Sequence, residues 1–172
     1  MSCDQEFRIH WIPTKFTTEP CLGLSHCPGK ISSRYGSELK LQLDLKSIRK
    51  QKVKTIITLI SRSEIERLQI PSFTELIKEN GFLHHELSIG DMRVPSDSDK
   101  MKVNKLIRKI SNEILLGCPV LIHCNYGFGR SGLVAALVLK FLNVNEDPVK
   151  TVRKYRPGAI ETAQQELFVL KW

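Results

Sequence analysis

Runs of apolar and polar residues along the chain follow two periods, one typical of strands and one typical of helices. Short runs of β-branched and apolar residues predict strands at residues 53–60, 82–89 and 119–122, and extended segments at 7–12 and 21–24 precede them. Helices are predicted between and after these strands, at residues 37–51, from Ser63, from Pro71, at about 97–116, at 132–142, at 148–155 and at 161–170.

This alternation predicts an α/β fold with a central, mostly parallel sheet that helices cover on both faces. Leu39, Leu43, Leu45 and Ile48 are the apolar positions of the first helix, and Ser63 is placed to cap the next one. A chain of 172 residues suffices for one well-buried domain, residues 1–172. In such folds, ligands bind at the carboxyl ends of central strands.

The most specific motif lies between a predicted strand and a predicted helix, where residues 123–132 read HCNYGFGRSG. The first turn of a helix has backbone N–H groups without partners, and together with the helix dipole they attract anions. The glycines allow the loop to fold tightly. Phosphate is therefore predicted to bind to Asn125, Tyr126, Gly127, Phe128, Gly129 and Arg130.

Side chains of the same motif supply the chemistry of a cysteine phosphatase. Cys124 is the predicted nucleophile, because a thiol attacks as its thiolate and the loop amides and Arg130 favour that anion. The planar fork of Arg130 suits two phosphate oxygens at once. Ser131 is expected to help the sulfur leave, and His123 to orient the loop from behind. Of the five cysteines, Cys124 alone has an arginine six positions later.

Expulsion of an alcohol or phenol from phosphorus requires a proton donor, and Asp91 is the predicted general acid. Asp91 follows a predicted strand and lies in a loop with a glycine and a proline. The alternative is that Asp91 is a solvated turn residue. Asp97 is interpreted as a helix N-cap, and Asp99 is a weaker candidate for the acid.

The Cys-x5-Arg-Ser loop with an upstream aspartate resembles the protein-tyrosine phosphatase superfamily, in its dual-specificity branch. Residues 22–24, 28–30, 84–91 and 158–165 are similar to segments of kinase-associated phosphatases and their bacterial relatives. The resemblance runs from about Trp11 to the end of the chain and implies the cysteine-phosphatase fold.

The resemblance implies a protein phosphatase that hydrolyses phosphotyrosine, with phosphoserine and phosphothreonine as further substrates. It implies that Cys124 is the nucleophile, that Arg130 binds phosphate and that Asp91 is the general acid. It also places Gln165 near the hydrolytic water. The neighbouring Gln164 competes for that role, and both are alternatively ordinary helix-surface residues.

Tyr126 and Phe128 depart from the family pattern, in which smaller residues are usual. Their rings must either pack beneath the loop or form part of the substrate rim, and packing is expected. The variable loop positions carry no lysine, which favours a substrate with a single phosphate over a phosphoinositide.

The chain has 26 Lys and Arg against 18 Asp and Glu, a net charge of +8. These basic residues are scattered without interleaved aromatics, which indicates a solvated surface, so nucleic acid and membrane are not expected as partners. The expected partner is a phosphoprotein substrate, with a protein kinase as one candidate, and the expected state is a monomer. An RNA 5′-phosphatase and a catalytically weak phosphopeptide-binding module are the alternatives.

Cysteine and histidine spacing bears on metal binding and compartment. His84 and His85 are adjacent on a predicted strand and so point to opposite faces, and no metal and no cofactor are predicted. An odd number of cysteines and an N-terminus without a signal pattern favour a reducing, cytoplasmic compartment, with signal-free delivery into another cell left open. A reversible disulfide from Cys21 or Cys27 to Cys124 is also left open, against plain buried thiols.

Overall fold

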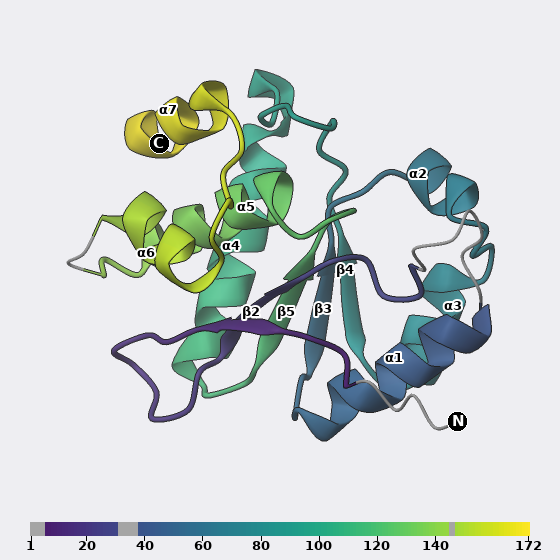
Figure 1. Cartoon of the computed structure of the whole chain (residues 1–172). Coiled ribbons are helices and arrows are strands. Elements are labelled where there is room, and N and C mark those ends of the chain that lie inside the picture. Colours follow the sequence, from purple (N-terminus) through teal and green to yellow (C-terminus); the bar gives the residue numbers. More distant parts are fainter. Residues whose placement is uncertain (1–5, 31–37, 145–146) are drawn as a thin grey trace.

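Five strands form one sheet in the computed structural model, which describes residues 6–30, 38–144 and 147–172 (Figure 1). The strands are β1 (His10–Ile12), β2 (Leu22–Ser25), β3 (Thr55–Thr58), β4 (Leu83–Glu86) and β5 (Val120–His123). Their order across the sheet is β1-β2-β5-β3-β4. Four of them run parallel, and β1 pairs antiparallel with β2 at one edge. The prediction of a mostly parallel sheet is confirmed.

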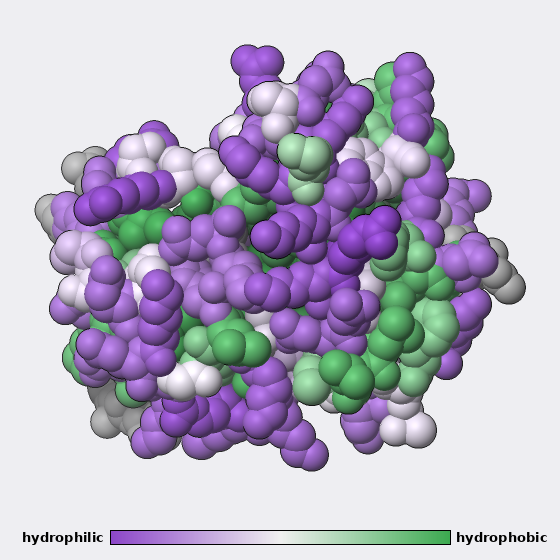
Figure 2. Space-filling model, turned by 180° about the vertical axis from the view of Figure 1, so that it is seen from behind, coloured by the Kyte–Doolittle hydropathy of each residue, from purple (hydrophilic) through white to green (hydrophobic). Residues whose placement is uncertain are grey.

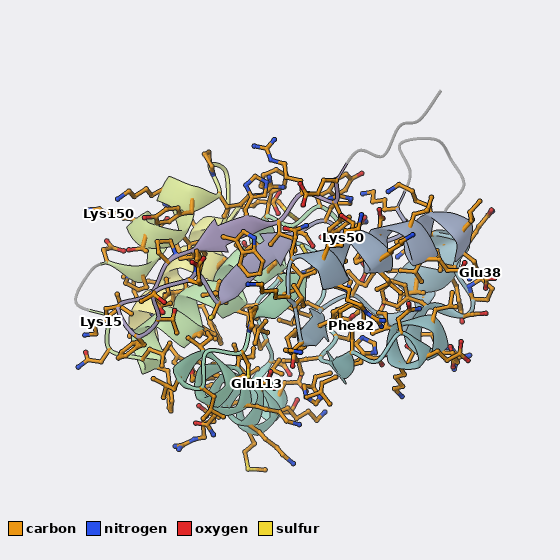
Figure 3. The ribbon with its side chains drawn as sticks, turned by 90° about the horizontal axis from the view of Figure 1, so that it is seen from below. Lys15, Glu38, Lys50, Phe82, Glu113 and Lys150 are labelled. Atoms are coloured by element: carbon orange, nitrogen blue, oxygen red, sulfur yellow. The ribbon has the colours of Figure 1, made fainter. Side chains whose placement is uncertain are left out.

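Helices cover both faces of this sheet, as predicted. The helices are α1 (Glu38–Lys50), α2 (Arg62–Arg67), α3 (Phe73–Glu79), α4 (Lys100–Leu115), α5 (Gly129–Phe141), α6 (Pro148–Tyr155) and α7 (Ala163–Lys171), with a 3₁₀ turn, η1 (Asp97–Asp99), before α4. Figure 3 shows α1, with Glu38 and Lys50 at its ends, and α4, which carries Glu113, on opposite sides of the sheet. Within the described ranges, no helix has the length and apolar character needed to cross a membrane.

The centre of the core is the pair formed by β5 and α5. Every residue of β5 is buried, and so is every residue of α5 from Gly129 to Leu139. A helix that is apolar on all sides is stable only where protein surrounds it, and α5 packs against α4, α6, α7 and the sheet. The helix begins three residues before the predicted start at Gly132, because the amide of Gly132 already donates to the carbonyl of Phe128.

The parallel strands bring four separate segments to one edge of the sheet. Ser25 at the end of β2 is in register with His123 at the end of β5, His123 with Thr58 at the end of β3, and Thr58 with Glu86 at the end of β4. Whatever follows each of these strands must therefore gather at the same place. This is the edge at which α/β proteins bind ligands.

The buried stripe of α1 differs from the predicted one. Leu41, Asp44, Leu45 and Ile48 are buried, which is the i, i+3, i+4, i+7 pattern of a helix packed on a core. Leu39 and Leu43 are 66% and 53% exposed, so their assignment to the apolar face was wrong. The buried stripe was not recognised in the sequence because it includes a charged residue, Asp44. The Asp44 carboxylate is buried and accepts a hydrogen bond from the amide of Gly29 at 2.8 Å.

Two predicted helix caps are also corrected. Ser61, and not Ser63, caps α2, in a capping box in which its hydroxyl accepts from the amide of Glu64 while the Glu64 carboxylate accepts from the amide of Ser61. Asp97 is not a helix N-cap. Because α4 begins three residues later than predicted, Asp97 is instead the first residue of η1. Its carboxylate pairs with Nζ of Lys100 at 2.8 Å.

We predict that Leu41→Ala lowers the free energy of unfolding by about 2–5 kcal/mol, since Leu41 is 0% exposed and its removal leaves a cavity. Leu39→Ala, the same change on the solvent side of α1, is expected to alter it by no more than about 0.5 kcal/mol. Urea denaturation of both variants measures the difference. Equal losses would contradict the observed orientation of α1.

Candidate active site

A buried thiol lies directly after β5, in a segment that we call the Cys124 loop (residues 124–131). The segment ends in the first turn of α5. Cys124 is 3% exposed. Its Sγ accepts a hydrogen bond from the amide of Gly127 at 3.2 Å and lies 3.5 Å from the Ser131 hydroxyl. Both groups are placed to stabilise negative charge on sulfur. The structure thus brings Cys124 and Ser131 together as the sequence predicted.

The peptide planes of the Cys124 loop are fixed from outside the loop. The carbonyl of Asn125 accepts from the amide of Cys27 at 3.2 Å, and the carbonyls of Tyr126 and Gly127 accept from the Arg156 guanidinium at 3.0 Å each. In a trans peptide the N–H points opposite to the C=O. With these carbonyls turned outward, the following amides face the side on which Sγ lies, which is the arrangement needed to surround an oxyanion.

Two glycines permit this tight course of the backbone. Gly127 has a φ of +76°, and a Cβ on it would lie 2.4 Å from the backbone of Ser25. A Cβ on Gly129 would lie 2.4 Å from the Glu161 carboxylate and 3.1 Å from Nε2 of Gln165. A larger residue at either position would push the loop away from β2 or α7.

Arg130 is buried in the first turn of α5, with 2% exposure. Its NH1 donates to both carboxylate oxygens of Glu64 at 2.9 Å and to the carbonyl of Ile89 at 3.1 Å. Its NH2 lies 3.1 Å from Oδ1 of Asp91. NH1 is thus occupied by protein groups, whereas Nε and NH2 form the edge of the guanidinium that can meet two oxygens of an anion.

Glu64 is a site residue that the sequence prediction missed. Its carboxylate is tied to the amide of Ser61 at 3.0 Å and to Arg130. Burial opposes the charged form, but the hydrogen bonds from Ser61 and Arg130 outweigh it and hold the pKa of Glu64 below its ordinary value. The available signal was the Ser-x-x-Glu capping box directly after a strand that points at the site.

Asp91 reaches the site from the loop after β4. Its carboxylate is 73% exposed on the solvent side of Arg130, so it can turn toward a leaving group without breaking core contacts. Asp97 and Asp99 bind elsewhere, to Lys100 and to Lys102 at 3.1 Å, so neither competes with Asp91. The geometry brings Asp91 to the loop as predicted.

His123 supports the Cys124 loop from the core. It is fully buried, with Nδ1 3.2 Å from the carbonyl of Cys124 and Nε2 2.7 Å from the hydroxyl of Thr58, which also lies 2.8 Å from Nε2 of His84. Burial lowers the pKa of His123 to about 3, so the ring is neutral at physiological pH. These contacts fit the predicted orienting role.

Gln165, and not Gln164, lies against the loop. Gln164 is exposed, whereas Gln165 is fully buried beside Gly129. The side-chain oxygen of Gln165 accepts from the amides of Glu161 and Thr162, and its Nε2 donates to the carbonyl of Arg93 at 3.3 Å. Gln165 therefore joins α7 to the Asp91 loop. Its role in holding water stays a prediction.

The two loop aromatics behave differently. The Phe128 ring packs against the Arg156 guanidinium, with 3.8 Å between the ring centroid and Cζ, as expected. Tyr126 is 63% exposed, so the prediction that it packs beneath the loop was wrong. The centroid of its ring lies 3.0 Å from Nζ of Lys30, and this Nζ also donates a hydrogen bond to Oδ1 of Asn125. Tyr126 and Lys30 therefore form part of the rim of the site.

The fold separates the two cysteines considered as partners of Cys124. Cys21 lies beside the start of β5, where its carbonyl accepts from Val120, so about four residues of strand, or roughly 13 Å, separate it from Cys124. That distance is too long for a disulfide. Cys27 lies next to the loop, but it is fully buried and burial raises the pKa of its thiol, which favours the plain buried thiol.

His84 and His85 point to opposite faces of the sheet, as predicted. The ring of His84 packs on Phe73 of α3. Burial and the charge of Lys109 on α4 lower the pKa of His85, against the opposite effect of Glu113 on the same helix. Among the described residues, no group of three or more His, Cys, Asp or Glu is arranged to hold a metal ion. The expectation that the protein needs no metal stays a prediction.

We predict that acid weakens the fold partly through His123. In the unfolded chain this histidine binds a proton near pH 6.5, whereas the buried ring resists protonation down to about pH 3. The free energy of unfolding should therefore fall as pH drops below 6.5, by up to about 1.4 kcal/mol per pH unit from this group. Urea titrations between pH 7 and 5 should show a shallower slope for His123→Asn, and parallel slopes would contradict the assignment.

A family model described as polymorphic toxin system, DSP-PTPase phosphatase, matches residues 32–142. Cyclin-dependent kinase inhibitor 3 of Rattus norvegicus is 25% identical over 163 residues, which cover 92% of this chain and 74% of that protein. A solved structure of kinase-associated phosphatase, with its catalytic-site cysteine substituted by serine, superposes with a TM-score of 0.83 at 24% identity and covers 96% of this chain and 93% of that one.

A solved structure of Tk-PTP in its active form superposes with a TM-score of 0.69 at 24% identity, over 91% of this chain and 92% of that one. These superpositions confirm the cysteine-phosphatase fold. The family match spans α1 to α5 and includes the Cys124 loop, Glu64 and Asp91. The chain belongs to the DSP-PTPase phosphatases of polymorphic toxin systems.

Proposed function

We propose that this chain is a cysteine-dependent dual-specificity protein phosphatase that works through a phosphocysteine intermediate on Cys124. One observation carries the proposal: a buried sulfur, loop amides whose neighbouring carbonyls are held outward, and a guanidinium fixed by Glu64 and paired with Asp91 meet at one strand-to-helix junction. Such a cradle matches the charge and shape of a phosphate monoester. Family membership supports the same class of reaction.

The first step transfers the phosphoryl group to the enzyme. Sγ of Cys124 forms a bond to phosphorus while the bond from phosphorus to the leaving oxygen breaks, and Asp91 gives its proton to that oxygen. Phosphate competes with Asp91 for NH2 of Arg130, from which Oδ1 of Asp91 lies 3.1 Å away. Binding of substrate would thus release the Asp91 side chain toward the leaving group.

The second step returns the enzyme to its starting state. Water attacks phosphorus and gives a proton to the Asp91 carboxylate, the bond between sulfur and phosphorus breaks, and inorganic phosphate leaves. The Ser131 hydroxyl, 3.5 Å from Sγ, is placed to stabilise the departing thiolate. Gln165 acts here by holding the Asp91 loop against α7 through the carbonyl of Arg93.

Phosphoproteins are the proposed substrates, with phosphotyrosine first and phosphoserine and phosphothreonine as further targets. The name of the rat relative refers to a cyclin-dependent kinase, so a phosphorylated kinase is one candidate. A nucleophile that works as a free thiolate must be kept reduced, and we propose a reducing compartment, in the producing cell or in a cell that receives the protein.

The mechanism is tested by turnover of a small aryl phosphate and of a phosphotyrosine peptide. Cys124→Ser should abolish both activities, and Asp91→Asn should reduce peptide turnover by about 10²- to 10⁴-fold, because an expelled side-chain oxygen then lacks its proton donor. Cys118→Ser, at a cysteine outside the loop, is the matched control and should remain active. Acid quenching followed by mass spectrometry should find phosphate on Cys124.

Turnover that survives in Cys124→Ser would refute the mechanism. A strong preference for 5′-phosphorylated RNA over phosphopeptides would instead favour the RNA 5′-phosphatase alternative. Tight binding of phosphopeptides with no turnover would favour the binding-module alternative.

We further predict that Glu64→Gln lowers kcat by about 10- to 100-fold, because Arg130 loses the charge that fixes its position. Glu66→Gln is the matched control on the same helix. Glu66 is 61% exposed and pairs with Arg62 at the surface, so its removal should leave kcat unchanged. Equal kinetics in the two variants would show that Glu64 does not position Arg130.

A further inference from the structure

A groove of about 470 Å³ runs along the edge strand β4, between α3 and α4. Figure 2 views the molecule from behind, the side on which α4 lies, and this surface is mainly hydrophilic. The site described above does not use the groove. Its lining residues are Thr74, Lys78, His84, His85, Glu86, Leu87, Lys102, Lys105, Leu106 and Lys109.

The groove is strongly cationic. Lys102, Lys105 and Lys109 lie on one stripe of α4 and are exposed, and Lys78 faces the groove from α3 on the other side. Lys102 pairs with Asp99 at 3.1 Å, but the described part of the chain offers no ion pair to the other three lysines. The acidic lining residue, Glu86, accepts a hydrogen bond from Thr74 at 2.6 Å. The groove therefore has a surplus of positive charge.

The floor of the groove offers unpaired hydrogen-bonding groups. The amides of Leu83 and Leu87 donate to Lys54 and Thr58, both at 3.0 Å, on the side of β3. Because backbone direction alternates along a strand, the amides of residues 84 and 86 point away from the sheet. An extended peptide could supply partners for such an edge.

A short segment of the chain joins the groove to the active site. Leu87 lines the groove, the carbonyl of Ile89 accepts from Arg130, and Asp91 lies at the guanidinium. From Leu87 to Asp91 is four residues, or at most about 14 Å of chain. A peptide held along β4 could therefore place a phosphorylated residue at Cys124 with a short spacer between the two.

We propose that this groove binds an acidic, extended segment of the phosphoprotein substrate, which adds to the β4 edge while its carboxylates pair with Lys78, Lys105 and Lys109. The inference rests on the proposed function, since it names the class of substrate that the same site receives. Single-stranded nucleic acid fits less well, because the lining contains no Phe, Tyr or Trp on which bases could stack.

The first experiment measures binding without catalysis. A fluorescent, unphosphorylated peptide with a run of Glu residues is titrated with the wild-type protein and with Lys105→Glu/Lys109→Glu, and anisotropy gives the Kd. We expect the double variant to weaken binding by on the order of tenfold or more, since two exposed charge pairs are lost and two repulsions gained. Lys46→Glu/Lys50→Glu, with the same spacing on exposed positions of α1, is the matched control and should bind as the wild type does.

Aryl phosphate turnover of the same variants separates this proposal from the proposed function. All three proteins should hydrolyse the aryl phosphate equally, because these lysines lie outside the Cys124 loop. If the wild-type protein does not hydrolyse the aryl phosphate, the proposed function is overturned, whereas the peptide-binding measurement still decides whether the groove binds an acidic segment. Equal peptide binding by the two double variants would overturn the groove proposal even if turnover is normal.

Hydrogen exchange tests the backbone contact. When the acidic peptide is bound, the amides of residues 84 and 86 should exchange more slowly, whereas those of α1 should not change. An unchanged rate at both amides would contradict strand addition. An RNA oligonucleotide provides the contrary outcome. If it binds more tightly than the peptide, and Lys105→Glu/Lys109→Glu abolishes this RNA binding, the groove would be assigned to nucleic acid and the proposal overturned.

Discussion

A buried guanidinium is the constraint on which the site depends. Arg130 sits in the first turn of the most buried helix, where an unpaired charge would be strongly unfavourable. Glu64 neutralises it and the carbonyl of Ile89 satisfies a further N–H, so NH1 is fixed in the protein, while NH2 lies beside Asp91. Segments after β3, β4 and β5 are joined by this one side chain. Its position therefore sets the positions of Asp91, the proposed general acid, and Cys124, the proposed nucleophile, relative to each other.

A second guanidinium, that of Arg156, orients the loop from outside. Arg156 binds the carbonyls of Tyr126 and Gly127, stacks on Phe128 and lies 2.6 Å from Nε2 of His10, a ring whose pKa is lowered by burial and by Arg156 itself. The loop amides face inward because their carbonyls have these partners. The anion site is thus held in place by protein groups, which is what electrostatic stabilisation of a transition state requires.

The parts that the sequence predicted are those encoded in contiguous residues. Cys124, Arg130 and Ser131 lie within one loop, so spacing alone identified them, and the strand before Asp91 pointed to the acid. Glu64 and Arg156 were missed because they act across 66 and 29 residues. The capping box around Glu64 can be recognised in the sequence, but it does not identify Arg130 as the partner. The apolar face of α1 was misassigned for a similar reason. Asp44 is buried by a hydrogen bond to Gly29, fifteen residues away, which periodicity cannot reveal.

The most direct test is a crystal structure of the wild-type protein with tungstate bound. We expect the oxyanion next to Sγ of Cys124, within hydrogen-bond distance of the loop amides, with Nε and NH2 of Arg130 on two of its oxygens and NH1 still held by Glu64. An empty loop, or an oxyanion bound while Arg130 has turned away from Glu64, would contradict it.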